Sequence, residues 1–202
     1  MLTDRARRLL ETGGVAFETL PHREAYTAQG VAAAVHVSGW LLAKVLVVST
    51  PGEGPVMVVL PASCRLDTAA LARVLGKPRV SLLPESDIKA LFPDCETGAM
   101  PPFGQLHGLP VWVDAFFPTV GEFAFQAGIP RGVVGMRYVE CERLARPVVA
   151  DIPAAESPLA SAYASSASGT PERAPRPSQS QTRGLASSSA WARSRSSSST
   201  SP

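Results

Sequence analysis

The sequence is poor in cysteine and has no arrangement of cysteines that predicts a cross-link. Its three cysteines, Cys64, Cys95 and Cys141, are far apart, odd in number and without a Cys-x-x-Cys pair. That pattern indicates neither a disulfide framework nor a zinc site, so no metal or cofactor is expected. We interpret them as reduced, partly buried thiols. Cys95, three residues before Gly98, is close enough in sequence to line a site there.

A long hydrophobic run is also missing. No apolar stretch reaches the roughly 18–20 residues that cross a bilayer. The first residues, MLTDRARRLLETGG, have the pattern of an amphipathic helix, and no apolar signal-peptide region follows their arginines. We therefore expect a cytoplasmic location and no membrane partner.

Basic charge is scarce in the part of the chain that is expected to fold. Residues 1–155 contain 14 basic and 15 acidic side chains, whereas residues 156–202 contain five arginines and two glutamates. The near-neutral first part gives no sign of a DNA partner. The second part consists largely of Ser, Ala, Pro and Arg, which bury too little apolar surface to offset the entropy of ordering. We expect a folded domain over 1–155 and a disordered tail over 156–202, either dispensable or weakly attracted to phosphate.

Helix and strand signals alternate irregularly before the tail. Capping residues and periodicity predict helices at 2–12, 27–34, 67–75 and 85–91. Apolar runs predict strands at 14–22, 43–50, 56–62, 77–82, 109–117, 122–128 and 132–140. Because the strands are expected to pair locally and regular βαβ repeats are missing, the sequence predicts a single mixed α/β domain. Its sheet is expected to be bent, or closed into a barrel, and flanked by helices.

Motifs for covalent or phosphate chemistry are absent as well. The sequence has no Gly-x-Ser-x-Gly motif, no glycine-rich phosphate loop, and no cysteine and histidine in a recognisable catalytic setting. The three histidines, His22, His36 and His107, are isolated, and an isolated histidine is more often structural than catalytic. Two features are left to explain, Lys44 and the segment GAMPPFGQLHG at 98–108.

Both features admit a structural and a functional interpretation. Lys44 begins an otherwise apolar strand, WLLAKVLVV, so it either extends from a strand edge to water or faces a site. The segment 98–108 has two prolines between glycines, which hold one shape and leave few amides free. Those amides belong either to a tight connection or to a surface that binds a substrate. The residues by themselves do not name a reaction.

Five segments in register resemble the YbaK/ProX-type aminoacyl-tRNA deacylases, which are free-standing relatives of the editing domain inserted in bacterial prolyl-tRNA synthetases. The resemblance covers about residues 10–146 and leaves the tail outside. The segments are PH at 21–22, YTAQGVA at 26–32, AKVLVV at 43–48, LDTAALARVLG at 66–76 and GAMPPFG…LPVWVD at 98–114.

This resemblance implies hydrolysis of the ester of a mischarged aminoacyl-tRNA at its acceptor end. The Gly-x-x-x-Pro loop, from Gly98 to Pro102, would present backbone amides to the oxyanion that forms during hydrolysis. Lys44 would anchor the terminal nucleotide or the aminoacyl group, and the vicinal hydroxyl of the substrate would assist the attacking water. The implied catalytic residues are Lys44, Gly98 and Ala99, and a tRNA synthetase is a candidate partner.

Two departures from the family leave the amino acid open. The synthetase domains have a histidine well after the glycine loop, but residues 126–136 here contain none. The cysteine-clearing members have a serine where this chain has Gln126. Substrate choice therefore cannot be transferred from either branch.

We expect His22, Thr27, Met100 and Pro102 to shape the substrate pocket. A catalytically silent module that binds an aminoacyl-tRNA end or a synthetase is the alternative. Lys44 together with an undisturbed glycine loop favours the enzyme, because a silent module needs neither. A general small-molecule-binding α/β domain would leave the five segments in register as coincidence.

Overall fold

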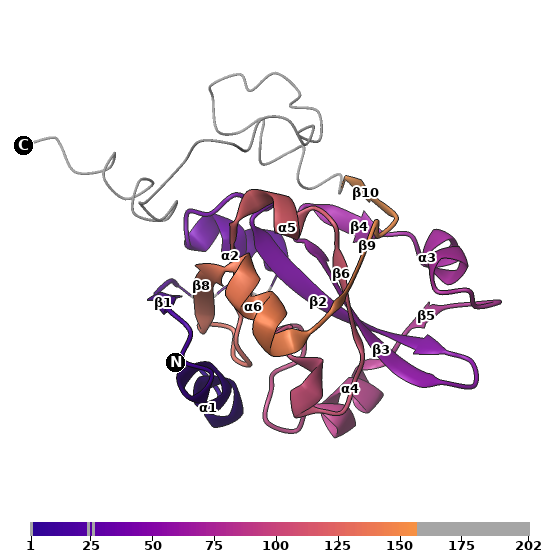
Figure 1. The fold of residues 1–202 in the computed structure, drawn as a ribbon, viewed down its shortest axis with the longest axis horizontal. Coiled ribbons are helices and arrows are strands. Elements are labelled where there is room, and N and C mark those ends of the chain that lie inside the picture. The colour runs from indigo at the N-terminus through magenta and orange to yellow at the C-terminus, as the bar shows by residue number, and fades with distance from the viewer. Residues whose placement is uncertain (1, 24, 26, 157–202) are drawn as a thin grey trace, which may run out of the picture.

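A computed structural model describes residues 2–156 of the chain, except Glu24 and Tyr26. These residues form one mixed α/β domain in which helices surround an eight-stranded sheet (Figure 1). The expected tail lies outside the described residues, apart from Glu156, which ends the last strand. Among the described residues, no helix is both long enough and apolar enough to cross a membrane.

The sheet is built around an antiparallel hairpin of β2 (Leu42–Thr50) and β3 (Gly54–Pro61), as the sequence predicts. The other strands are β1 (Phe17–Leu20), β4 (Cys64–Leu66), β5 (Ser81–Leu82), β6 (Val111–Asp114), β7 (Glu122–Gln126), β8 (Val133–Arg137), β9 (Val148–Ala150) and β10 (Ala154–Glu156). The strand order is β1-β8-β7-β2-β3-β6-β9, with β5 also paired to β2, and β4 and β10 form a separate two-stranded sheet. The pairs β2–β7, β3–β6 and β6–β9 are parallel.

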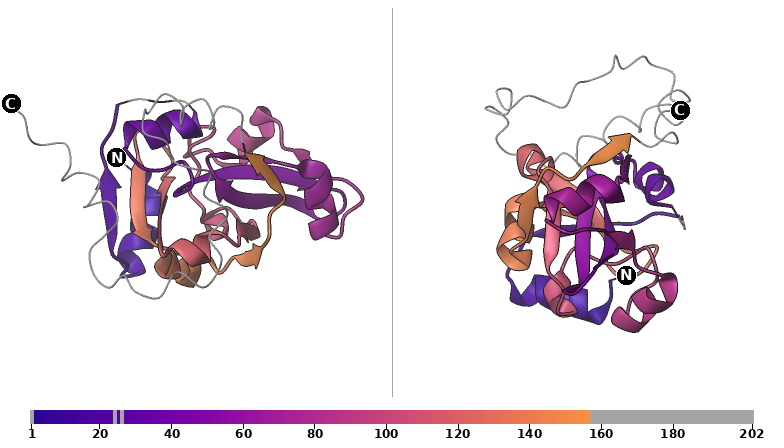
Figure 2. Two further views of the ribbon diagram at one scale, coloured as in Figure 1. Left: turned by 90° about the horizontal axis from the view of Figure 1, so that it is seen from above. Right: turned by 90° about the vertical axis from the view of Figure 1, so that its right-hand side faces the viewer.

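The large sheet is strongly bent. Figure 2 shows β1 and β8 turned steeply against the β2–β3 hairpin, in keeping with the twist that every sheet accumulates from strand to strand. One edge of β2 is shared by two partners: Leu42 and Ala43 pair with β7, while Val48 and Ser49 pair with β5. Among the described residues, the strand order of the large sheet begins at β1 and ends at β9 without closing, so the sheet is bent and open.

Two of the helices, α2 and α3, begin at the capping residues that the sequence predicts. Thr27 Oγ1 accepts a hydrogen bond from the Gly30 amide at 3.0 Å, and Asp67 Oδ1 accepts one from the Ala70 amide at 2.9 Å. Each cap satisfies an amide that the first helical turn leaves without a backbone partner. The helices are α1 (Asp4–Thr12), α2 (Ala28–Ala34), α3 (Thr68–Val74), α4 (Glu85–Leu91), α5 (Phe117–Val120), α6 (Tyr138–Ala145) and the 3-10 helix η1 (Gly104–Leu106).

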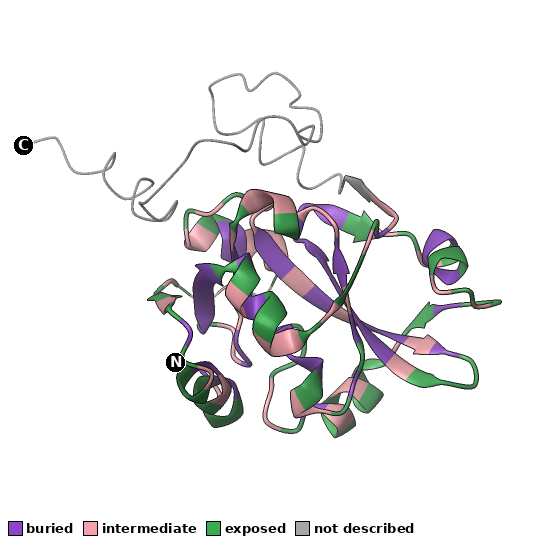
Figure 3. Cartoon of the chain, in the orientation of Figure 1, coloured by how far each residue is buried: buried purple, intermediate pink, exposed green. Residues whose placement is uncertain are grey.

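Aromatic and aliphatic side chains bury the two central strands. Phe103, Phe123 and Phe125 are fully buried, and neighbouring ring centroids in this group lie 5.4 Å apart. Figure 3 shows the same distribution, with burial concentrated in the strands and exposed residues on the outer sides of α1 and α6. Removing this apolar surface from water is the main driving force for the fold.

Two predicted strands are partly wrong. The strand expected at 77–82 is reduced to β5, and the strand expected at 132–140 ends at Arg137, where α6 begins. In α6, Tyr138 and Cys141 are both buried, because residues three apart share one face of a helix. The Tyr138 ring packs on Phe123 at a centroid distance of 5.9 Å, a contact that the local sequence does not reveal.

Candidate functional site

The Gly98–Pro102 loop is fixed by hydrogen bonds to the turn after β7. The Glu96 amide donates to the Gly128 carbonyl at 2.8 Å, and the Gly128 amide donates to the Ala99 carbonyl at 2.7 Å. Within the loop, the Ala99 amide donates to the Glu96 carbonyl at 2.9 Å. The loop is therefore held in one conformation before any ligand arrives, and the Ala99 amide is already used to hold it.

Two other amides of the loop are not consumed by backbone hydrogen bonds. The Gly98 amide donates to the thioether sulfur of Met100 at 3.3 Å, and sulfur of this kind is a weak acceptor. The Met100 amide has no hydrogen-bond partner among the described residues. Pro101 and Pro102 have no amide hydrogen to offer, so Gly98 and Met100 are the donors that the loop has available.

Gly98 has a backbone that suits glycine and faces open space. Its φ is +89°, and a Cβ built at this position would meet nothing within 4 Å. By contrast, the side chains of Met100 and Phe103 are buried, with exposures of 3% and 0%. The loop thus exposes its backbone at Gly98 and packs into the core through the side chains of Met100 and Phe103. Pro102, between these two residues, is also buried.

Lys44 lies in β2, half-buried, and its Nζ donates a hydrogen bond to the Cys64 carbonyl at the start of β4. Burial lowers the pKa of the Lys44 ammonium, and the neighbouring Cys64 acts weakly in the opposite direction. The side chain is therefore half-buried and bonded to the protein, and does not simply extend from a strand edge to water as in the structural interpretation.

The structure connects Lys44 to the loop through β7. Ala43, next to Lys44, pairs with Phe125, and Gly128, just after β7, holds the loop. The side chain of Met100 packs in the cluster that contains Ala43. Because successive side chains of a strand point to opposite faces, Lys44 leaves β2 on the face opposite to this cluster.

His22 and Thr27 lie in the segment that leads into α2. His22 Nδ1 is 2.6 Å from the Arg23 carbonyl, and its buried Nε2 has no hydrogen-bond partner among the described atoms. Thr27 uses its side-chain oxygen to cap α2. The Thr27 hydroxyl accepts the capping hydrogen bond and keeps its O–H donor, and His22 keeps Nε2, so each side chain has a polar group left for a ligand.

An open hollow of about 540 Å³ lies beside the loop. None of the predicted site residues lines it. Its walls come from α4 and from the segment before Gly98, namely Glu85, Lys89, Phe92, Pro93, Cys95, Glu96 and Thr97.

Cys95 is poorly suited to act as a nucleophile in this hollow. The pKa of the Cys95 thiol is raised to about 12, chiefly by burial and also by the neighbouring Asp94 carboxylate. Arg5 acts on this pKa in the opposite direction. The thiolate is the reactive form of cysteine, so in the absence of a metal ion the raised pKa disfavours this thiol as a nucleophile at neutral pH. The described residues give no evidence for covalent catalysis.

Comparison with known proteins identifies the family. The family model described as the aminoacyl-tRNA editing domain matches residues 22–144. No curated protein matches the chain. The crystal structure of a candidate trans-editing enzyme for prolyl tRNA synthetase is 26% identical, with a TM-score of 0.63 over 75% of this chain and 98% of that one.

Two further solved structures share the fold. One, from a study of epitope backbone grafting on scaffold proteins, is 28% identical with a TM-score of 0.62 over 75% of this chain and 97% of that one. The other, a hypothetical protein, is 22% identical with a TM-score of 0.67 over 75% and 100% of the two chains, and supports the fold alone. Because the matched family segment spans more than half of the sequence, the chain belongs to the aminoacyl-tRNA editing domain family, which assigns it to aminoacyl-tRNA editing in general.

Proposed function

We propose that the chain is a trans-editing deacylase that hydrolyses the ester bond of a mischarged aminoacyl-tRNA at its acceptor end. The observation that carries this proposal is the prearranged loop, with the Gly98 amide on a weak sulfur acceptor and the Met100 amide without a partner among the described residues. Ester hydrolysis passes through an oxyanion, and fixed amides placed where that charge develops lower the barrier. A tRNA synthetase is a candidate partner that supplies affinity for the rest of the tRNA.

The loop can perform this role at little cost. An oxyanion that takes the place of the Met100 sulfur exchanges a weak acceptor of the Gly98 amide for a strong one. The hydrogen bonds through Glu96, Ala99 and Gly128 already hold the loop, so little reorganisation is needed when the charge appears. In this assignment Ala99 fixes the loop, and Gly98 and Met100 donate to the oxyanion.

Lys44 is assigned to substrate anchoring. Its ammonium is held at the Cys64 carbonyl, which leaves two of its three N–H donors for an anionic or carbonyl group. The phosphate of the terminal nucleotide or the aminoacyl carbonyl provides such a group. His22 Nε2, which is buried without a partner among the described atoms, is assigned to a polar group of the same substrate end.

The test is a deacylation assay on tRNAs charged with Ala, Ser, Cys, Thr and Pro. Wild type is expected to release one amino acid faster than the buffer blank does. In Lys44→Ala the rate of release is expected to fall at least about tenfold, the effect of losing a hydrogen bond to a charged group. The matched control is Lys77→Ala, which removes a lysine that pairs with Glu53 at the far end of the hairpin and is expected to keep wild-type turnover.

Two outcomes contradict parts of this proposal. Full activity in Lys44→Ala would show that the anchoring assignment is wrong. Binding of charged tRNA without release would identify a silent binding module. Release only after a synthetase is added would instead support the synthetase as the partner.

A further inference from the structure

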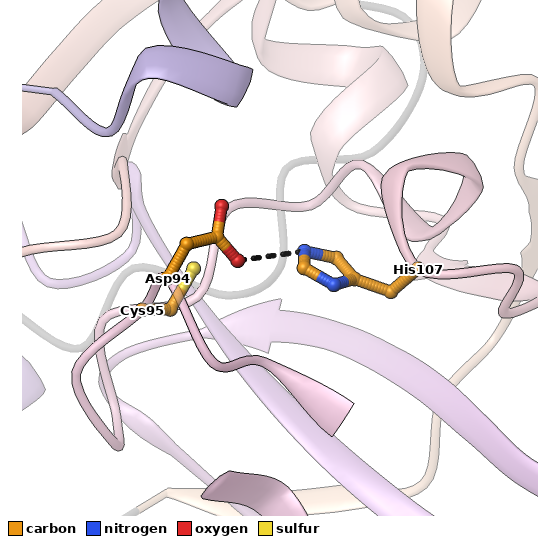
Figure 4. A group of neighbouring side chains, drawn as sticks. All are labelled: Asp94, Cys95 and His107. Carbon is orange, nitrogen blue, oxygen red and sulfur yellow. Dashed lines mark ion pairs between the residues drawn. The ribbon is translucent and has the colours of Figure 1, made fainter. Parts of the chain in front are cut away.

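Three side chains that bind metals in other proteins meet at the two ends of the glycine loop. Asp94 and Cys95 precede Gly98, and His107 follows η1 (Figure 4). One ligand atom from each residue, a carboxylate oxygen, the thiol sulfur and an imidazole nitrogen, lies within 4.8 Å of the other two. The Asp94 Oδ1 atom is 4.0 Å from His107 Nε2.

His107 is fixed with one nitrogen aimed into this cluster. Its side chain is only 2% exposed, and Nδ1 lies 3.0 Å from the Leu91 carbonyl. A carbonyl only accepts hydrogen bonds, so the proton of the neutral ring sits on Nδ1 and Nε2 presents its lone pair. The Phe92 ring packs on the imidazole at a centroid distance of 4.3 Å.

The polar atoms of the cluster are buried without hydrogen-bond partners among the described residues. This holds for both Asp94 oxygens and for His107 Nε2. The Asp94 side chain as a whole is 29% exposed, whereas that of His107 is 2% exposed, so His107 Nε2 is the atom that most calls for a bound partner such as an ion. Arg5 approaches Asp94 Oδ2 at 3.9 Å, so the other oxygen is the one that faces His107.

We propose that Asp94, Cys95 and His107 form a binding site for a zinc-like divalent cation. A carboxylate oxygen, a thiolate and an imidazole nitrogen are ligands that Zn²⁺ accepts, with ligand bonds of about 2.0–2.3 Å. The separations in the cluster need to close by small side-chain rotations to reach such bonds. The carbonyl that orients His107 is the arrangement that metal-binding histidines commonly have.

Such a cation would clamp the glycine loop. The loop leaves the cluster after Cys95 and returns to it at His107, so one ion joins its two ends. Binding displaces the Cys95 thiol proton to solvent and leaves a sulfur–metal bond. Three protein ligands leave the fourth position of a tetrahedral ion to water, and the site does not depend on the proposed deacylase activity.

The experiment uses the full chain freed of metal with a chelator and then titrated with Co²⁺ and Zn²⁺. Wild type is expected to bind one Co²⁺ with a sulfur-to-cobalt charge-transfer band, and Zn²⁺ is expected to displace it and raise Tm. Cys95→Ala is expected to lose the band, and His107→Gln is expected to weaken affinity about 100-fold or more.

Matched controls remove a thiol and an imidazole elsewhere. Cys141→Ala removes a buried cysteine of α6. His36→Asn replaces a histidine at φ +55°, a conformation that asparagine tolerates. Both controls are expected to bind Co²⁺ as wild type does, with circular dichroism confirming that every variant is folded.

Two results would overturn the proposal. One is a wild-type protein that shows neither the charge-transfer band nor a Zn²⁺-dependent rise in Tm. The other is a band that persists unchanged in Cys95→Ala and His107→Gln, since the ion would then sit elsewhere. These readouts report metal binding and not hydrolysis. A wild-type protein that binds Co²⁺ as expected but does not deacylate tRNA would therefore count against the proposed function alone.

Discussion

Replacing Gly98 with alanine tests whether the backbone of the loop takes part in hydrolysis. Gly98 has φ +89°, and no atom lies within 4 Å of the position that an alanine Cβ would take, so the added methyl group causes strain but no clash. The left-handed conformation costs a non-glycine residue about 1–2 kcal/mol. The lower entropy of the unfolded alanine chain returns about 0.4–1 kcal/mol of this.

The expected net loss of stability is thus about 0–1.6 kcal/mol. For a domain of this size, that corresponds to a Tm lower by at most about 6 °C. The effect on deacylation is expected to be far larger. Displacing one oxyanion donor costs about 100- to 1,000-fold in turnover, and the new methyl group also projects into the open space in front of the amide.

Gly76→Ala is the matched control. Gly76 follows α3, has φ +65° and likewise meets nothing within 4 Å of its Cβ position, so its strain is similar. The two variants should lose similar stability in thermal unfolding, while only Gly98→Ala loses deacylation. If Gly98→Ala is destabilised like Gly76→Ala but deacylates as wild type does, the loop amide is not a catalytic donor.

Four further predictions concern other parts of the chain. Gly128→Ala places a Cβ 2.1 Å from Thr3 Cγ2 at φ +96°, so overpacking and strain should cost about 2–5 kcal/mol in urea unfolding; Thr3→Ser, which keeps the cap oxygen, should restore part of it, and no rescue would refute the clash. Burial lowers the pKa of Lys44 below its ordinary value of 10.5, so between the folded and unfolded pKa values the unfolded chain binds more protons at this residue. The free energy of unfolding of wild type should therefore rise with pH in that range. Lys44→Met should lack this rise, and parallel stability–pH curves for the two proteins would contradict the prediction. Ile152 is fully buried, so Ile152→Ala should cost about 2–5 kcal/mol, whereas deleting 157–202 should leave Tm unchanged; a large drop on deletion would show that those residues pack on the domain.

Local sequence signals determined most of the elements. The caps at Thr27 and Asp67 are confirmed, because a side-chain oxygen and the amide that it satisfies are only three residues apart. The β2–β3 hairpin is confirmed for a similar reason, since two apolar runs and one tight turn specify it. The family, too, could be inferred from short segments in register, and residues 22–144 match its model.

The site itself depended on contacts that no local pattern contains. Tyr138 starts a helix rather than continuing a strand because it packs against Phe123, which lies in a neighbouring strand. The Ala99 amide donates to the Glu96 carbonyl within the loop, a hydrogen bond that motif matching alone does not reveal.

The sequence by itself determined the chemistry that is available, and tertiary structure decided which groups meet. Asp94, Cys95 and His107 predict no site from the sequence alone, because the glycine loop separates His107 from the other two residues. Folding returns the chain to its starting point and brings their ligand atoms within 4.8 Å. Convergence of this kind follows from loop closure and core packing, which involve residues distant in the chain, and so only the folded domain reveals it.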